Sequence, residues 1–188
     1  QQRAGFSLPP SVVAANLVNY PTSKTQSLSP GQSVLLNGLM ADAPDWDDIQ
    51  WLRKNTNLPV WIKGISHPQD AILAVESGCA GIVVSNHGGR TLDGLAPSID
   101  LLPPVRSAVG EAFPILLDSG IRRGTDIFKA IALGALESMI GRPVLNGLAV
   151  AGALGVAHSL TLLQQELELA MALTGCETIS DITLDCIY

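Results

Sequence analysis

The chain has 188 residues, of which 47% are hydrophobic, so it can bury a core and is not typical of a disordered protein. Its formal net charge of −6 argues against nucleic acid or an anionic membrane surface as a partner. The three cysteines, Cys79, Cys176 and Cys186, are odd in number and lack CxxC spacing, which predicts reduced thiols in a cytoplasmic protein.

The first 57 residues differ from the rest of the chain. Residues 3–35 are rich in Pro, Ser and Asn and show little periodicity, which predicts a long loop. The stretch "DWDDIQWLRKNTN" then predicts a short helix with Asp45 as its N-cap. We therefore expect residues 1–57 to lead into one domain that spans residues 58–188. The N-terminus has no apolar core, so we expect no signal peptide.

From Leu58 onward one pattern repeats. Apolar, β-branched runs at 59–65, 80–89, 113–121 and 137–144 alternate with the stretches "HPQDAILAVESG", "SIDLLPPVRSAVG" and "GTDIFKAIALGA". Each of these stretches ends near a glycine, a common helix stop. Strands that alternate with helices at this period predict βαβ units and a parallel sheet, and the continuously apolar runs predict strands covered on both faces.

The segment 147–163 raises the question of a membrane span. It is apolar but only about 17 residues long, which is the lower limit for crossing a bilayer, and it contains glycines and His158. We expect a buried helix, or one packed at a subunit interface, in a soluble protein.

Polar residues gather where the predicted strands end. The residues at these ends are Lys63, then Ser85, His87 and Arg90, then Asp118 and Arg122, then Gly141 and Arg142. In (β/α)8 barrels and in open α/β sheets alike, this edge carries the ligand. We therefore expect a site there.

Two of these strand ends predict a phosphate site. "DSGIRRGTD" joins a strand to a helix whose N-terminus offers N–H groups, with Arg122 and Arg123 adding charge, and "IGRP" places Gly141 and Arg142 beside it. The alternative is a plain turn with solvated arginines.

The histidine at the second strand end has charged residues near it. His87 lies three residues before Arg90, a spacing that suits a general base beside a carboxylate clamp, and Lys63 suits an electrostatic role near them. His67 and His158 lack such company, and we expect them to be structural. No metal site is expected, because no second ligand stands at a suitable spacing.

The motifs "VSNHGGRTLD", "LLDSGIRRGTDIFKAIALGA", "IGRP" and "WIKGI" closely resemble the FMN-dependent 2-hydroxy acid oxidases and dehydrogenases. The resemblance implies an α/β fold, the (β/α)8 TIM barrel, with FMN as cofactor. It implies that His87 takes the hydroxyl proton of the substrate and that Arg90 pairs with the substrate carboxylate. Lys63 and Ser85 match flavin contacts, and the ribityl and phosphate contacts match Asp118, Gly120, Arg122, Gly141 and Arg142.

The resemblance also shows what this sequence lacks. A barrel of this type needs about 250 residues, and nothing here matches the family's first four strands. We expect this chain to supply the C-terminal four β/α units and to need the missing N-terminal half as a partner. The family usually has Asp-Gly-Gly where this chain has Asp-Ser-Gly at 118–120, from which we expect little change. The role of Glu137 is unexplained.

The expected activity is the FMN-dependent oxidation of an (S)-2-hydroxy acid to the 2-oxo acid. His87 would remove the hydroxyl proton while hydride passes to flavin N5, and oxygen or another acceptor would take the electrons. We expect a homo-oligomer, with no nucleic acid and no membrane as partner. The alternatives are a different FMN barrel enzyme, such as an isomerase, and a catalytically silent half-barrel that binds flavin or phosphate.

Overall fold

The structure, a computed structural model, describes residues 9, 11–13, 15 and 29–187, so most of the predicted N-terminal loop lies outside the described residues. The chain divides into two compact units, 1–44 and 45–188. In the described part of the first unit a short helical segment, η3 (Val34–Leu39), interrupts the loop. The Ser33 hydroxyl accepts the Leu36 N–H at 3.1 Å, which caps the turn that sequence reasoning missed.

The second unit opens with the expected short helix, α1 (Trp46–Lys54). The Asp45 carboxylate accepts the N–H groups of Asp47 and Asp48, and the Asp48 carboxylate accepts the Asp45 N–H. This reciprocal arrangement is a capping box, so the prediction of Asp45 as N-cap is confirmed.

The four predicted apolar runs form four strands of one parallel sheet. The strands are β1 (Trp61–Ile65), β2 (Gly81–Val84), β3 (Ile115–Asp118) and β4 (Glu137–Met139). They pair in the order β1-β2-β3-β4, with Ile82 opposite Ile115 and Leu116 opposite Glu137. Sequential parallel strands joined by helices are the repeating unit of a (β/α)8 barrel, and the four units here agree with half of one.

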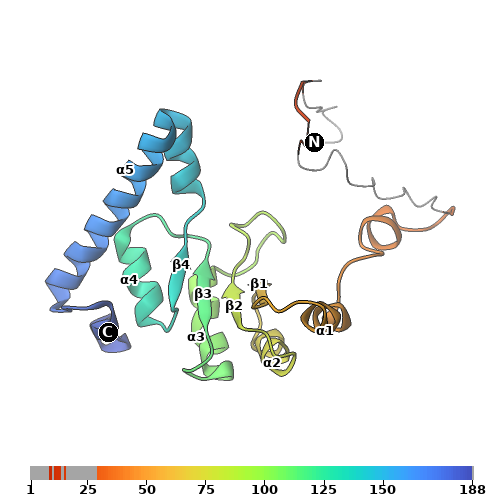
Figure 1. Cartoon of the computed structure of the whole chain (residues 1–188), viewed down its shortest axis with the longest axis horizontal. Helices are drawn as coiled ribbons and strands as arrows, with labels where there is room; N and C mark the ends of the chain where they lie inside the picture. The colour runs from red at the N-terminus through yellow and green to blue at the C-terminus, as the bar shows by residue number, and fades with distance from the viewer. Residues whose placement is uncertain (1–8, 10, 14, 16–28, 188) are drawn as a thin grey trace. The chain divides into compact units, whose positions relative to one another are not determined.

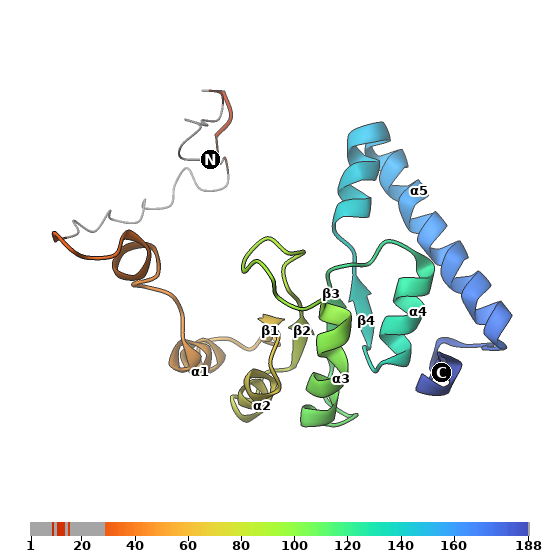
Figure 2. The ribbon, with the colours of Figure 1, turned by 180° about the vertical axis from the view of Figure 1, so that it is seen from behind.

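Three helices connect these strands, and all three were predicted. They are α2 (Pro68–Glu76), α3 (Ser98–Val109) and α4 (Gly124–Ala132). Each packs on the neighbouring strands in chain order, as Figures 1 and 2 show for the yellow, green and teal helices. His67 caps α2, because its Nδ1 accepts the Gln69 N–H at 3.2 Å, so its predicted structural role is confirmed.

The core lies between these helices and the sheet. Its largest fully buried side chains are Ile82, Val84, Leu102, Val105, Ile115 and Leu117. Each such side chain contributes about 1.5–3 kcal/mol by leaving water. The expectation of strands covered on both faces holds along the whole of β2. It is wrong for β1 and β4, the first and last strands of the described sheet, which are largely exposed, and Glu137 of β4 faces solvent.

The last helix, α5 (Arg142–Thr174), is not buried within this chain, so the first of the two expectations for segment 147–163 is wrong, and packing at a subunit interface stays a prediction. Of its side chains only Leu163 is buried. Its 33 residues are long and apolar enough to suit a membrane span by length and composition, with mean hydropathy 1.4 over its most apolar window. The backbone is non-helical at Ala151 and Gly152, however, so two arms fold back on each other (Figure 1).

The two arms of α5 touch through small residues. A Cβ added at Gly155 would come within 1.9 Å of the Gly147 carbonyl oxygen, so only glycine permits this approach. The longer arm then packs against α4, as both ribbon views show. This packing places Glu166 of α5 beside the start of α4, next to the candidate site.

Candidate active site

The carboxyl ends of the four strands surround one cavity of about 200 Å3. The predicted residues that line it are Lys63, His87, Arg90, Asp118, Gly120, Arg122, Gly141 and Arg142. Because parallel strands end at one edge of the sheet, residues up to 79 positions apart in sequence meet here. Two predicted site residues are absent from this lining: Ser85, which is buried at 2% exposure, and Arg123, which is the N-cap residue of α4.

A hydrogen-bonded network of Lys63, Ser85 and Asp118 forms the floor of the cavity. The Lys63 ammonium donates to Asp118 Oδ2 at 2.6 Å and to Ser85 Oγ at 3.0 Å. The Ser85 hydroxyl in turn donates to Asp118 Oδ2. The ends of three strands are thereby linked through their side chains, which fixes the position of the Lys63 charge beside the cavity.

The network keeps Asp118 ionised. Burial alone would raise the pKa of this carboxyl, but hydrogen bonds from Lys63 and Ser85 and the charge of Lys63 outweigh it, so the pKa is lowered. The Lys63 side chain remains 39% exposed. Its ammonium can therefore face a ligand while Asp118 holds it from behind.

A left-handed turn carries the histidine. His87 has φ 55°, and Gly88 and Gly89 follow with φ 68° and 70°. A non-glycine residue in this region costs about 1 kcal/mol or more, and such residues cluster at functional sites. The His87 N–H donates to Ser85 Oγ at 3.0 Å, so the buried serine helps to hold the turn. The glycines therefore let the chain present an exposed imidazole and, at Arg90, an exposed guanidinium beside one cavity.

Ser119 is a site residue whose conformation sequence reasoning missed. Its φ is 86°, a value that favours glycine, the residue that the resemblance led us to expect at this position. Its hydroxyl accepts the Gly88 N–H at 2.8 Å and donates to Asp118 Oδ2 at 3.2 Å. The serine thus connects the end of β3 to the histidine turn, and only its place between Asp118 and Gly120 in the motif hinted at a special conformation.

The start of α4 corrects one expectation. The N–H groups of Arg122 and Arg123 both donate to Asp126 Oδ2 at 2.9 Å, and the Gly124 N–H donates to Glu166 Oε2 at 2.8 Å. These N–H groups are therefore not free for a phosphate. A Cβ at Gly124 would come within 2.1 Å of the Leu167 nitrogen, so the glycine of "RRG" admits α5 rather than a ligand.

The two arginines predicted to bind phosphate do lie together. Arg142 donates from one nitrogen to the Gly88 carbonyl at 2.8 Å, and Arg122 donates to the Ile121 carbonyl at 2.9 Å. A guanidinium has five N–H donors, so most of the donors of each arginine remain available to an anion. Gly120 and Gly141, beside them, have open space where a Cβ would project.

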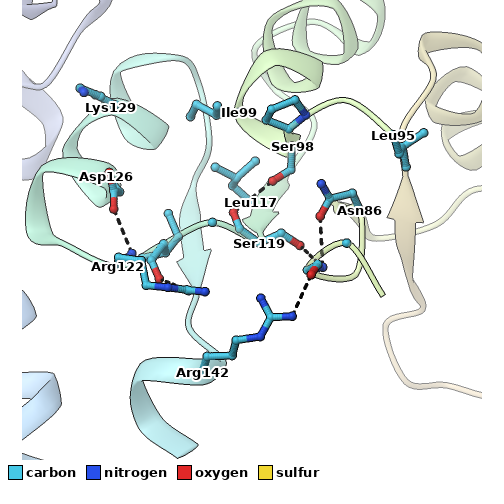
Figure 3. A pocket seen from close by; sticks show the side chains of 15 residues that line it. Asn86, Leu95, Ser98, Ile99, Leu117, Ser119, Arg122, Asp126, Lys129 and Arg142 are labelled. Atoms are coloured by element: carbon cyan, nitrogen blue, oxygen red, sulfur yellow. Dashed lines mark hydrogen bonds between the residues drawn. The ribbon is translucent and has the colours of Figure 1, made fainter. Parts of the chain in front are cut away.

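A second cavity of about 440 Å3 adjoins the first. Figure 3 shows Arg122 and Arg142 on its one side and the loop that holds Asn86 on the other. The Ser98 hydroxyl at the start of α3 donates to the Ser119 carbonyl at 3.1 Å and closes it. Both cavities share Ser119, Arg122 and Arg142, so the arginines border one continuous hollow large enough for an extended ligand.

The charge of the site indicates the class of ligand. Lys63, Arg90, Arg122 and Arg142 face the first cavity with His87, and Asp118 is the single carboxylate that lines it. Such an excess of cations in an acidic protein suits two anionic groups, one at the two phosphate-site arginines and one at Arg90. Among the described residues no cluster of three potential metal ligands occurs.

Comparison with known proteins identifies the family. The sequence model of the FMN-dependent dehydrogenase family matches residues 1–188. An L-lactate oxidase of Alicycliphilus denitrificans is 51% identical over 183 residues, which is 97% of this chain and 50% of that protein. A peroxisomal (S)-2-hydroxy-acid oxidase of Oryza sativa is 52% identical over 73% of this chain and 38% of its own length.

Solved structures agree in fold. A mandelate oxidase with (S)-2-phenylpropionate superimposes with TM-score 0.77 at 41% identity, over 96% of this chain and 48% of that one. A lactate oxidase of Pediococcus acidilactici does so with TM-score 0.72 at 49% identity, over 74% of this chain and 39% of that one. The chain spans about half the length of the curated relatives that it matches across nearly its whole length, and it comprises four β/α units of a TIM barrel. It belongs to the FMN-dependent dehydrogenase family.

Proposed function

We propose that the protein binds FMN and oxidises an (S)-2-hydroxy acid to the 2-oxo acid. The observation that carries this proposal is the joint placement of His87, Arg90 and Lys63 around a cavity that also holds two arginines for a phosphate. Relatives described as lactate, glycolate and (S)-2-hydroxy-acid oxidases support the same chemistry.

The residues present fit FMN. Arg122 and Arg142 would hold the phosphate, with Gly120 and Gly141 leaving room for it, while Asp118 would accept from the ribityl chain. Lys63 lies across the cavity and would stabilise negative charge that develops on the flavin ring. Bound FMN would take up the two electrons and the hydrogen that leave the α-carbon of the substrate.

The residues of the substrate end act on a carboxylate and a hydroxyl. Arg90 would hold the carboxylate through two parallel hydrogen bonds and so fix the α-carbon, an effect of positioning that can amount to several kcal/mol. One nitrogen of the exposed His87 imidazole would accept the hydroxyl proton. The carboxylate of Asp118 already engages Lys63 and Ser85, which leaves His87 as the base among these residues.

The second candidate is a half-barrel that binds flavin without turnover. It is favoured by β4, which is largely exposed at the edge of the described sheet. Such edges present unpaired backbone groups that barrel closure would remove. We therefore propose that activity requires the N-terminal half of the barrel as a partner, and that oxygen accepts the electrons as the names of the oxidase relatives suggest.

The test uses the protein that contains residues 1–188, reconstituted with FMN, and measures flavin content and oxygen uptake with L-lactate, glycolate and (S)-mandelate. His87→Ala should retain FMN and lose about 100- to 10,000-fold in kcat, because the base is removed without touching the phosphate contacts. His158→Ala, at an exposed position on α5, should behave like the wild type. Full activity in His87→Ala would refute the mechanism, and bound flavin without any turnover in the wild type would favour the silent half-barrel.

A further inference from the structure

Two of the three cysteines lie together at the C-terminal end of the described chain. Cys176 follows α5 directly, and Cys186 ends the short helix η5 (Leu184–Cys186). Their sulfur atoms are 3.7 Å apart, which is van der Waals contact. We name these two residues the C-terminal thiol pair. Sequence spacing did not reveal it, because the chain between them folds back over ten residues.

The two thiols differ in exposure. Cys176 is 7% exposed and belongs to a small cluster with Phe128, Ala132 and Ile182, whereas Cys186 is half-buried and can meet a small solute. The backbone N–H of Thr183 donates to Cys186 Sγ at 3.5 Å. Both thiols can donate to one acceptor, the Asp181 carbonyl, at 3.6 Å each, which aligns them side by side.

The environment of Cys186 favours its thiolate. The hydrogen bond from the Thr183 backbone N–H lowers the pKa of this thiol, whereas burial raises it. Hydrogen bonds with the Thr183 hydroxyl and the Cys176 thiol also lower it. Cys79 is the contrast, because burial in the main core raises the pKa of its thiol. Since the thiolate is the reactive form, Cys186 is the attacking group of the three cysteines.

We propose that Cys176 and Cys186 form a reversible disulfide when the protein meets a hydroperoxide. The sulfurs must approach from 3.7 Å to about 2.0 Å, a movement that side-chain rotation and a small shift of the terminal turn can supply. Neither cysteine lines either of the two cavities, and their oxidation goes beyond the oxidation of hydroxy acids.

The reaction balances with the peroxide as oxidant. The Cys186 thiolate attacks one peroxide oxygen, so an S–O bond forms while the O–O bond breaks and the leaving oxygen takes a proton from water. The Cys176 thiol, losing its proton, then attacks the sulfur of this sulfenic acid, so the S–S bond forms and water leaves. Two thiols give up two electrons and the peroxide is reduced to an alcohol and water, or to two waters when it is hydrogen peroxide.

The disulfide would restrict the motion of the segment between Cys176 and Cys186. It would join the end of α5 to η5, which packs on α4, and so restrain a loop of about ten residues. Because α4 begins two residues after Arg122, the cross-link would stabilise the helix that follows one of the two phosphate-site arginines. We expect the oxidised protein to unfold a few degrees higher than the reduced protein.

The experiment treats the reduced protein with a small molar excess of hydrogen peroxide, blocks remaining thiols with N-ethylmaleimide and digests with a protease that cuts after glutamate. Glu177 lies between the two cysteines, so an intramolecular disulfide links peptide 169–177 to the peptide that begins at Thr178. The linked pair should form in the wild type and in Cys79→Ala, should be absent in Cys186→Ser, and should disappear on addition of dithiothreitol. The peroxide is added, so the result does not depend on the proposed oxidase activity.

Three outcomes would overturn the proposal. One is Cys186 recovered as sulfinic acid with Cys176 still alkylated. Another is a link between two different chains, which shows as mixed peptides when labelled and unlabelled protein are combined. The third is alkylation of both cysteines after peroxide to the same extent as Cys79, because two alkylated thiols cannot be joined in a disulfide.

Discussion

The sheet has one buried cation at the edge where its strands begin and one half-buried cation at the edge where they end, and the two cations have opposite roles. At the edge where the strands begin, Arg106 of α3 is 7% exposed and donates to the carbonyls of Gly110, Phe113 and Gly134 at 2.6 to 3.0 Å. At the edge where the strands end, Lys63 has one carboxylate behind it and stays 39% exposed. A buried cation with four of its five donors occupied stabilises the fold, whereas an exposed cation is available to a ligand.

The difference also appears in the backbone. The loops that Arg106 joins are ordinary turns before β3 and β4, and they stay close because one guanidinium bridges them. The loops at the other edge contain His87 and Ser119, the two non-glycine residues with positive φ in the part of the chain that the structure describes. Backbone strain and a cation available to a ligand therefore occur together where the strands end. This combination is expected of a binding site rather than of a structural core.

The largest effect on stability is expected at Arg106. Arg106→Met removes the charge and leaves the partly buried Gly134 carbonyl and the other acceptors without this donor, so the free energy of unfolding should fall by about 2–4 kcal/mol. Urea unfolding followed by circular dichroism measures this. Lys54→Met, at an exposed position at the end of α1, should change it by less than about 0.5 kcal/mol. Equal effects of the two variants would abolish the distinction between the edges.

At the other edge a cation can be altered without loss of stability. Arg90→Lys keeps the charge but replaces a planar fork with a point, so we expect KM for the hydroxy acid to rise strongly and kcat to fall, with kcat/KM reduced about 10- to 100-fold. Steady-state oxygen uptake gives both constants, and the unfolding midpoint should match the wild type. An unchanged kcat/KM would remove Arg90 from the carboxylate site.

Acid should weaken the Lys63–Asp118 link while leaving the Arg106 bridge intact. The pKa of Asp118 is lowered in the folded state, so its contribution to stability is fully present above the unfolded value of about 3.9 and is lost as the pH falls through the lower folded value. Urea unfolding between pH 7 and pH 3 should therefore show a loss below about pH 4 that is smaller in Asp118→Asn. A loss of the same size in this variant would assign the acid sensitivity to other carboxylates.

The sequence predicted the parts of this comparison that depend on short-range signals. Apolar runs located the strands, Asp45 marked the start of α1, and the polar residues that follow strands located Lys63, His87 and Asp118 at one edge. It could not show that Glu166 caps α4, because the two lie 42 residues apart and meet only through the packing of α5. The fold-back of α5 and the contact of Cys176 with Cys186 are equally products of tertiary packing.

The smallest expected effect concerns Ser119, where strain and hydrogen bonding oppose each other. Ser119→Ala keeps a side chain at φ 86° but loses the bonds to Gly88 and Asp118, so it should lower the free energy of unfolding by about 1–2 kcal/mol. Ser119→Gly loses the same bonds but removes about 1 kcal/mol of backbone strain, so it should remain within about 1 kcal/mol of the wild type. Urea unfolding of the three proteins should rank them as serine, glycine, alanine in falling stability. If alanine matched or exceeded glycine, the backbone at this position would not be strained, and the link between strain and the ligand edge would rest on His87 alone.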